Sequence, residues 1–179
     1  MDIYIERGMW GSVAAGVLIL LLIPSIRYLG LYAPANLAVM TTLIAIAIYV
    51  YRNFDRSLGN KFFRWLGPPV IGLAAIGVVM LALGLYAGAA AISISYWGEP
   101  VMGYFVYKKL REEAPTSSLL FLASAAAFAY TIPLVLLGPW EVPFAADAVK
   151  VAVLLAITRR SAAVVRPSTP PHAPHHKTS

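Results

Sequence analysis

Long runs of apolar residues, separated by short segments rich in lysine and arginine, constrain this chain more than any other feature of its sequence. A helix needs ~20 mainly apolar residues to cross the hydrocarbon core of a bilayer. Four runs have about that length: 8–29, 34–51, 116–138 and 142–158. Charged residues make up only 12% of the chain, which is about half their share in a soluble domain. The sequence therefore predicts an all-α, polytopic helix bundle in the cell membrane, with the lipid bilayer as its surroundings.

The stretch 66–108 decides how often the chain crosses, because only Glu99 interrupts its apolar character. Read as one span, it gives five helices, and the basic residues then divide 5 to 8 between the two sides. Read as two spans with a tight turn at 84–88, it gives six helices. One side then carries twelve basic residues: Arg7, Arg52, Arg56, Lys61, Arg64, Lys108, Lys109, Arg111, Arg159, Arg160, Arg166 and Lys177. The other side carries only Arg27, since Lys150 lies within a span.

This division favours six helices, because cytoplasmic loops collect lysine and arginine. Both termini are then expected in the cytoplasm, and the +6 net charge is attributed to the membrane surface and not to nucleic acid. Pro68 and Pro69 suit the first turn of the third helix. The expected spans are 8–29, 34–52, 66–86, 89–108, 116–138 and 141–159, within a transmembrane domain of residues 1–165. Residues 166–179 are rich in proline and histidine and are expected to form a disordered cytoplasmic tail.

Glu99 is the first candidate functional residue, because it lies about ten residues from either end of the fourth predicted span. A carboxylate at that depth costs ~2.5–3.5 kcal/mol or more unless it is paired, hydrated or protonated. One interpretation is a site that binds a proton, a coupling cation or a cationic substrate. The other is a structural pair, or a hydrated kink beside Pro100.

Lys150 is a possible partner for Glu99, because it lies at a similar depth in the sixth predicted span. Asp147 is three residues earlier, on the same face of that helix. A local Asp147–Lys150 pair that lets the helix insert is somewhat favoured over a Glu99–Lys150 contact. Both remain open from the sequence.

Small residues mark the turn after the third helix, where Gly84 and Gly88 form a G-x-x-x-G motif. This spacing lets helices approach closely. Since Gly88 falls in the predicted turn, the motif indicates a helical hairpin more than a dimer seam.

The sequence lacks the residues that several kinds of catalytic and metal-binding sites require. The chain has no cysteine, and its histidines all lie in the tail, so no predicted span offers a haem ligand or a zinc motif. The usual nucleophile–base pairs are missing as well. We therefore expect no catalytic residues, no metal site, no cofactor and no enzyme activity.

The run GLYAGAAAISISYWGEPVMGYFVYKKLREEAPTSSLLFLASAAAF at 84–128 resembles part of the drug/metabolite transporter superfamily, EamA-like branch. There a turn of small residues leads into a helix with a mid-span proline, matched by Pro100, and then to a cytoplasmic acidic residue, matched by Glu112 or Glu113. The resemblance covers about residues 8–138, one five-helix repeat. Members usually carry two inverted repeats, so a lone repeat implies an oligomer or a membrane-protein partner.

Two functions follow as expectations. The first is a small transporter or permease-like protein for a small metabolite or cation, working as an oligomer with Glu99 at its centre. The second is a non-catalytic membrane subunit or scaffold of a larger complex, in which Glu99 and Lys150 are only buried pairs. A water-accessible cavity that reaches Glu99 is required by the first function and not by the second.

Overall fold

The computed structural model describes residues 2–164, and in that part of the chain every regular element is a helix, which confirms the all-α prediction. The predicted tail, 166–179, lies outside the described residues. The helices are α1 (Ile3–Leu29), α2 (Pro34–Leu58), α3 (Lys61–Ala82), α4 (Ala87–Tyr96), α5 (Gly98–Leu110), α6 (Pro115–Thr131), α7 (Leu134–Leu137) and α8 (Glu141–Val164).

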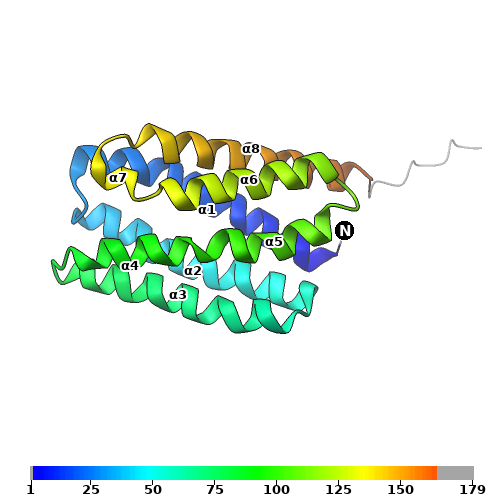
Figure 1. Cartoon of the computed structure of the whole chain (residues 1–179), viewed down its shortest axis with the longest axis horizontal. Coiled ribbons are helices and arrows are strands. Elements are labelled where there is room, and N and C mark those ends of the chain that lie inside the picture. Colours follow the sequence, from blue (N-terminus) through cyan, green and yellow to red (C-terminus); the bar gives the residue numbers. More distant parts are fainter. Residues whose placement is uncertain (1, 165–179) are drawn as a thin grey trace, which may run out of the picture.

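The helices run back and forth along the long axis of the molecule (Figure 1), and their contacts close a ring. Helix α1 packs on α2, α2 on α3, α3 on α4 and α5, α5 on α6, α6 on α8, and α8 back on α1. Helix α5 continues the line of α4 (Figure 1). We call the end where α1 begins and α8 ends the terminal end, and the opposite one the distal end.

Three helices, α1, α2 and α3, are long and apolar enough to cross a membrane, which suggests a membrane location. At 1.5 Å per residue, the 22 residues of α3 extend about 33 Å, enough for a hydrocarbon core of ~30 Å. Helix α8 has a similar length, 24 residues, but carries Asp147 and Lys150 within it. The remaining two traverses of the bundle are interrupted, one between α4 and α5 and the other between α6 and α7.

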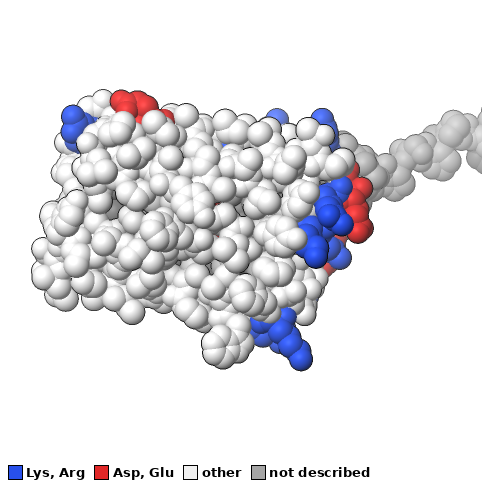
Figure 2. Space-filling model, in the orientation of Figure 1, with Lys and Arg blue, Asp and Glu red and all other residues white. Residues whose placement is uncertain are grey.

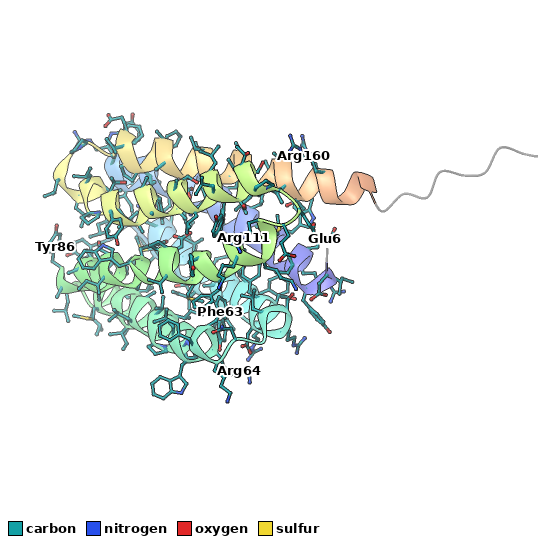
Figure 3. The ribbon with its side chains drawn as sticks, turned by 45° about the vertical axis from the view of Figure 1, so that its right-hand side comes forward. Glu6, Phe63, Arg64, Tyr86, Arg111 and Arg160 are labelled. Atoms are coloured by element: carbon teal, nitrogen blue, oxygen red, sulfur yellow. The ribbon has the colours of Figure 1, made fainter. Side chains whose placement is uncertain are left out.

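Charged side chains gather at the two ends of the bundle, and the wall between them is nearly free of charge on the face that Figure 2 shows. The terminal end carries most of them, among them Glu6, Arg64, Arg111 and Arg160, whereas Tyr86 lies at the distal end (Figure 3). Membrane proteins have this distribution, because charges stay in water and apolar side chains face lipid.

Helix α3 begins earlier than the apolar pattern predicts, so the placement of Pro68 and Pro69 in its first turn is wrong. Asn60 caps the helix by accepting from the Phe62 and Phe63 amides at 2.9 and 3.0 Å, and α3 starts at Lys61. Pro68 has no N–H for the Arg64 carbonyl four residues earlier. The Tyr51 hydroxyl of α2 donates to that carbonyl instead, at 3.0 Å. An apolar run marks the part that lipid can cover, and the helix extends past it.

The turn between α3 and α4 depends on glycines. Gly84 has a φ of 77°, which a residue with a side chain rarely adopts. Gly88, which was predicted to fall in the turn, lies instead in the first turn of α4 and faces Gly77 of α3. A methyl group added at Gly77 would come within 2.7 Å of the Gly88 carbonyl oxygen. The motif therefore serves both the turn and the close packing of the two helices.

Two apolar clusters fill the bundle. One lies toward the terminal end and includes Met9, Phe63 and Leu154. The other lies toward the distal end and includes Ile23, Leu81 and Phe128. Asp147 and Lys150 lie between Ala146 of the second cluster and Val151 of the first along α8. Glu99 likewise lies between Tyr96 and Met102.

Candidate functional site

The three charged residues singled out from the sequence meet at one point inside the bundle. Lys150 Nζ lies 2.9 Å from Glu99 Oε1, across from α8 to α5. It also lies 2.8 Å from Asp147 Oδ1, one turn earlier on α8. Both pairs that the sequence left open as alternatives are therefore present together. We call Glu99, Asp147 and Lys150 the charged triad.

Burial differs sharply among the members of the charged triad. The Asp147 side chain is fully buried, that of Lys150 is 5% exposed and that of Glu99 is 31% exposed. Lys150 and Asp147 are close enough to form an ion pair. Within residues 2–164, however, neither oxygen of Asp147 accepts a well-aligned hydrogen bond. Asp147 is thus the enclosed acid of the triad, and Glu99 is the one that remains accessible.

The charged triad has an aromatic and a glycine neighbour that sequence reasoning missed. Lys150 Nζ lies 4.3 Å from the ring centroid of Phe128 on α6, within cation–π range. The Tyr96 ring packs edge-on against Phe128 at 5.3 Å. On α1, a methyl group added at Gly16 would come within 3.8 Å of both Asp147 oxygens. Tyr96 could have been found, because it lies three residues before Glu99, but nothing local distinguishes Phe128 or Gly16.

Pro100 explains why the helix breaks beside Glu99. Proline has no N–H, so the Tyr96 carbonyl, four residues earlier, loses its helical donor. At the break, the Trp97 amide donates to the Ile94 carbonyl three residues earlier, at 3.1 Å, and not to a carbonyl four residues earlier as in a regular α-helix. Trp97 ends α4, and Glu99 then falls in the first turn of α5.

A cavity of about 290 Å³ lies inside the ring of helices, and Glu99 and Lys150 both line it. Its other lining residues are mainly apolar, such as Ile19, Ala74 and Met102. Polar groups on its wall include Ser12, Ser93, Ser95, Tyr51 and Tyr96. This is the usual composition of a small-molecule pocket, an apolar wall with a few convergent polar groups.

Of the other residues chosen from the sequence, Pro100 lies beside the charged triad, whereas Gly84 and Gly88 shape the α3–α4 hairpin and do not line the cavity. Within the described chain, no group of three acidic, histidine or cysteine side chains is placed to hold a metal ion.

Counted with all three groups ionised, the charged triad has a charge of −1. Lys150 compensates one carboxylate and leaves the second without a cation. An isolated charge is expensive in a low-dielectric interior. Acidic groups therefore outnumber basic ones by one in the charged triad, and Lys150 is shared between them.

Comparison of the chain with protein-family models, with curated proteins and with solved structures finds no match. The resemblance of residues 8–138 to the EamA-like branch stays a prediction.

Proposed function

We propose that this protein is a small, permease-like transporter that binds a small metabolite or cation in its cavity, next to Glu99. The observation that carries the proposal is the cavity itself, which is lined by an accessible acid of the charged triad. A scaffold needs no internal space beside a charged group. A transporter needs such a space for its solute.

The proposal includes six membrane spans with both termini in the cytoplasm of a cell-membrane protein. Two features support it. The chain passes along the bundle in alternating directions, with two of the passes broken at Trp97 and at Pro133. The basic residues gather at the terminal end, the arrangement that the positive-inside rule favours for a cytoplasmic face. Broken helices near a central site are also common in secondary transporters.

The rival function, a non-catalytic membrane subunit or scaffold, is favoured by one observation. Asp147 and Lys150 form a pair that is almost wholly enclosed on one helix, as a purely structural pair would be. Partner chains or an oligomer fit either function. The two functions differ in whether water and solute reach the cavity.

Cysteine labelling tests the proposal, because the chain has no cysteine of its own. Ser93→Cys places a thiol on the cavity wall. Ser124→Cys is the matched control, since Ser124 is 6% exposed and does not line the cavity. We expect a membrane-impermeant, positively charged thiosulfonate to label Ser93→Cys from one side of sealed vesicles and to leave Ser124→Cys unlabelled.

The labelling also has a clear negative outcome. If Ser93→Cys and a second cavity variant, Ser12→Cys, resist the reagent from both sides while they react in detergent-denatured protein, the cavity is closed to water. That result would contradict transport and leave the scaffold.

A further inference from the structure

A second hollow lies on the outer wall of the bundle, between α3 and the line formed by α4 and α5, which pack side by side (Figure 1). We call it the outer groove. It is distinct from the inner cavity, because only Val70 and Ser95 line both. Its other walls are formed mainly by large apolar side chains of the two sides: Phe62, Leu66 and Leu73 from α3, and Ile94, Trp97 and Val101 from α4 and α5.

The lining of the outer groove suits a hydrocarbon chain. Among residues 2–164, no charged side chain lines it. The hydroxyl of Ser95 already donates to the Ile92 carbonyl at 2.6 Å. Gly98 brings α5 against α3 at this point, because a methyl group added there would collide with the Val70 side chain. An apolar chain in the groove would therefore strip water from few polar groups.

The outer groove has about the length of one bilayer leaflet. From Phe62 to Leu73, α3 rises about 16 Å, close to half of a hydrocarbon core of ~30 Å. Trp65 is exposed near the terminal end of α3, and tryptophan is enriched at the membrane surface. The groove thus lies in the leaflet at the terminal end, with its Phe62 end toward the headgroups.

Lys108 lies beside the headgroup end of the outer groove. Val101 and Lys108 are seven residues apart, which puts them on one face of α5, two turns from each other. The Phe62 and Phe105 rings are 5.8 Å apart, so Lys108 follows about one turn beyond the level of Phe62. Its Nζ lies 5.8 Å from the ring centroid of Tyr104. The ammonium group is therefore at the depth where a lipid in the groove carries its phosphate.

The charge of Lys108 is available to such a lipid. Within residues 2–164 its exposed ammonium group forms no ion pair, whereas Arg64 of α3 is paired with Asp55 at 3.0 Å. We propose that the outer groove holds one acyl chain of an anionic phospholipid, whose headgroup lies against Lys108. The proposed orientation makes this leaflet cytoplasmic, the side on which anionic lipids create a negative surface. The lipid site itself requires a membrane location but not transport.

Quenching of Trp97 fluorescence in nanodiscs tests the proposal, because Trp97 lines the outer groove. Trp10→Phe, Trp65→Phe and Trp140→Phe together leave it as the only tryptophan of the full chain. Bromine atoms on an acyl chain quench a tryptophan that they contact. Brominated phosphatidylglycerol is compared with brominated phosphatidylcholine at equal mole fraction. We expect the anionic lipid to bind about fivefold more tightly, the effect of one lysine beside an anionic headgroup.

Lys108→Gln should remove this preference and leave the two lipids with equal affinity. Lys109→Gln is the matched control, because Lys109 is also exposed but points about 100° further round α5. It should keep the preference. Added sodium chloride should weaken the preference while Lys108 is present, which gives a second measurement that needs no lysine variant to fold.

Three results would overturn the proposal. Equal quenching by both lipids before any lysine is changed would show a groove that accepts any acyl chain. A preference that survives Lys108→Gln would place the anionic headgroup elsewhere. Quenching by neither lipid would exclude an acyl chain, and a disulfide between two copies of Val101→Cys would then identify a second copy of the chain as the occupant. None of these results concerns the inner cavity, so transport is judged by the labelling experiment alone.

Discussion

Lys150 contacts two carboxylates with a single positive charge, and the two carboxylates have different surroundings. Asp147 is enclosed by its own helix and by Gly16 of α1, and among residues 2–164 it pairs with Lys150. Glu99 lines the cavity and remains partly exposed, so a ligand in the cavity can reach it. The structural pair and the candidate binding residue are thus parts of one site, with different roles.

Unequal effects are expected when each member of the charged triad is neutralised. Lys150→Met leaves two facing carboxylates and should destabilise the protein by about 3–5 kcal/mol, the cost of a buried charge that loses its partner. Glu99→Gln and Asp147→Asn each leave one acid with one base, and should cost much less. Thermal unfolding in nanodiscs measures the loss of stability of each variant. Lys109→Met is the control, because Lys109 is exposed and its loss should change the stability very little.

Adding Asp147→Asn to Lys150→Met should recover part of the lost stability, because the enclosed acid is then neutral. No recovery in the double variant would show that another contact of the lysine, such as that of its ammonium group with the Phe128 ring, outweighs its pairing with Asp147.

Close approach between helices depends on glycine at several places in the ring, among them the α3–α4 and α1–α8 contacts. Gly77 and Gly88 bring α3 and α4 together, and Gly16 brings α1 against Val151 of α8. Without these contacts the helices could still form, since their lengths and caps are local. Their separation and rotation would change, and with them the position of Glu99 relative to α8.

Gly88→Val tests the α3–α4 contact, because the added side chain would meet the Gly77 carbonyl and the Leu81 amide of the neighbouring backbone. We expect a loss of about 1–3 kcal/mol, typical of overpacking. Gly72→Ala is the matched control on α3, since a methyl group there meets no atom within 4 Å. The midpoint of thermal unfolding measures both changes. If Gly72→Ala shifted this midpoint as much as Gly88→Val, the cause would be helix propensity and not packing.

The number of times that the chain crosses the bilayer determines on which side of the membrane each terminus lies. Six crossings put the two termini on the same side, and five put them on opposite sides. The terminal end carries most of the charged groups, and Arg27 lies near the other end of α1. The asymmetry predicts one fixed orientation in the membrane, with the terminal end in the cytoplasm.

Reporter fusions measure this orientation. A fluorescent protein that matures only in the cytoplasm should fluoresce at the N-terminus and at the C-terminus of the full chain. Fused after Leu137, at the distal end, it should stay dark, and an alkaline phosphatase fused there should be active. Fluorescence at one terminus only would support five crossings and contradict the proposed topology.

The helical fold, the places where the chain turns and the gathering of basic residues near one end follow from the sequence alone. Apolar length and proline or glycine at a turn act locally, so they can be read without knowing the neighbours. The depth of Glu99 and Lys150 along their helices could be predicted for the same reason. The start of α3 was missed because the prediction followed the apolar run, whereas the local cap at Asn60 starts the helix before that run.

Only the tertiary structure decided that Glu99 and Lys150, 51 residues apart, touch each other and Asp147 at the same time. Sequence periodicity gives the depth of a residue along a helix, but the rotation of that helix about its axis depends on packing with its neighbours. Phe128 and Gly16 join the site for that reason, with no local signal. The closure of the ring around a cavity is likewise a property of all the helices together, and it turns a pair of buried charges into a candidate binding site.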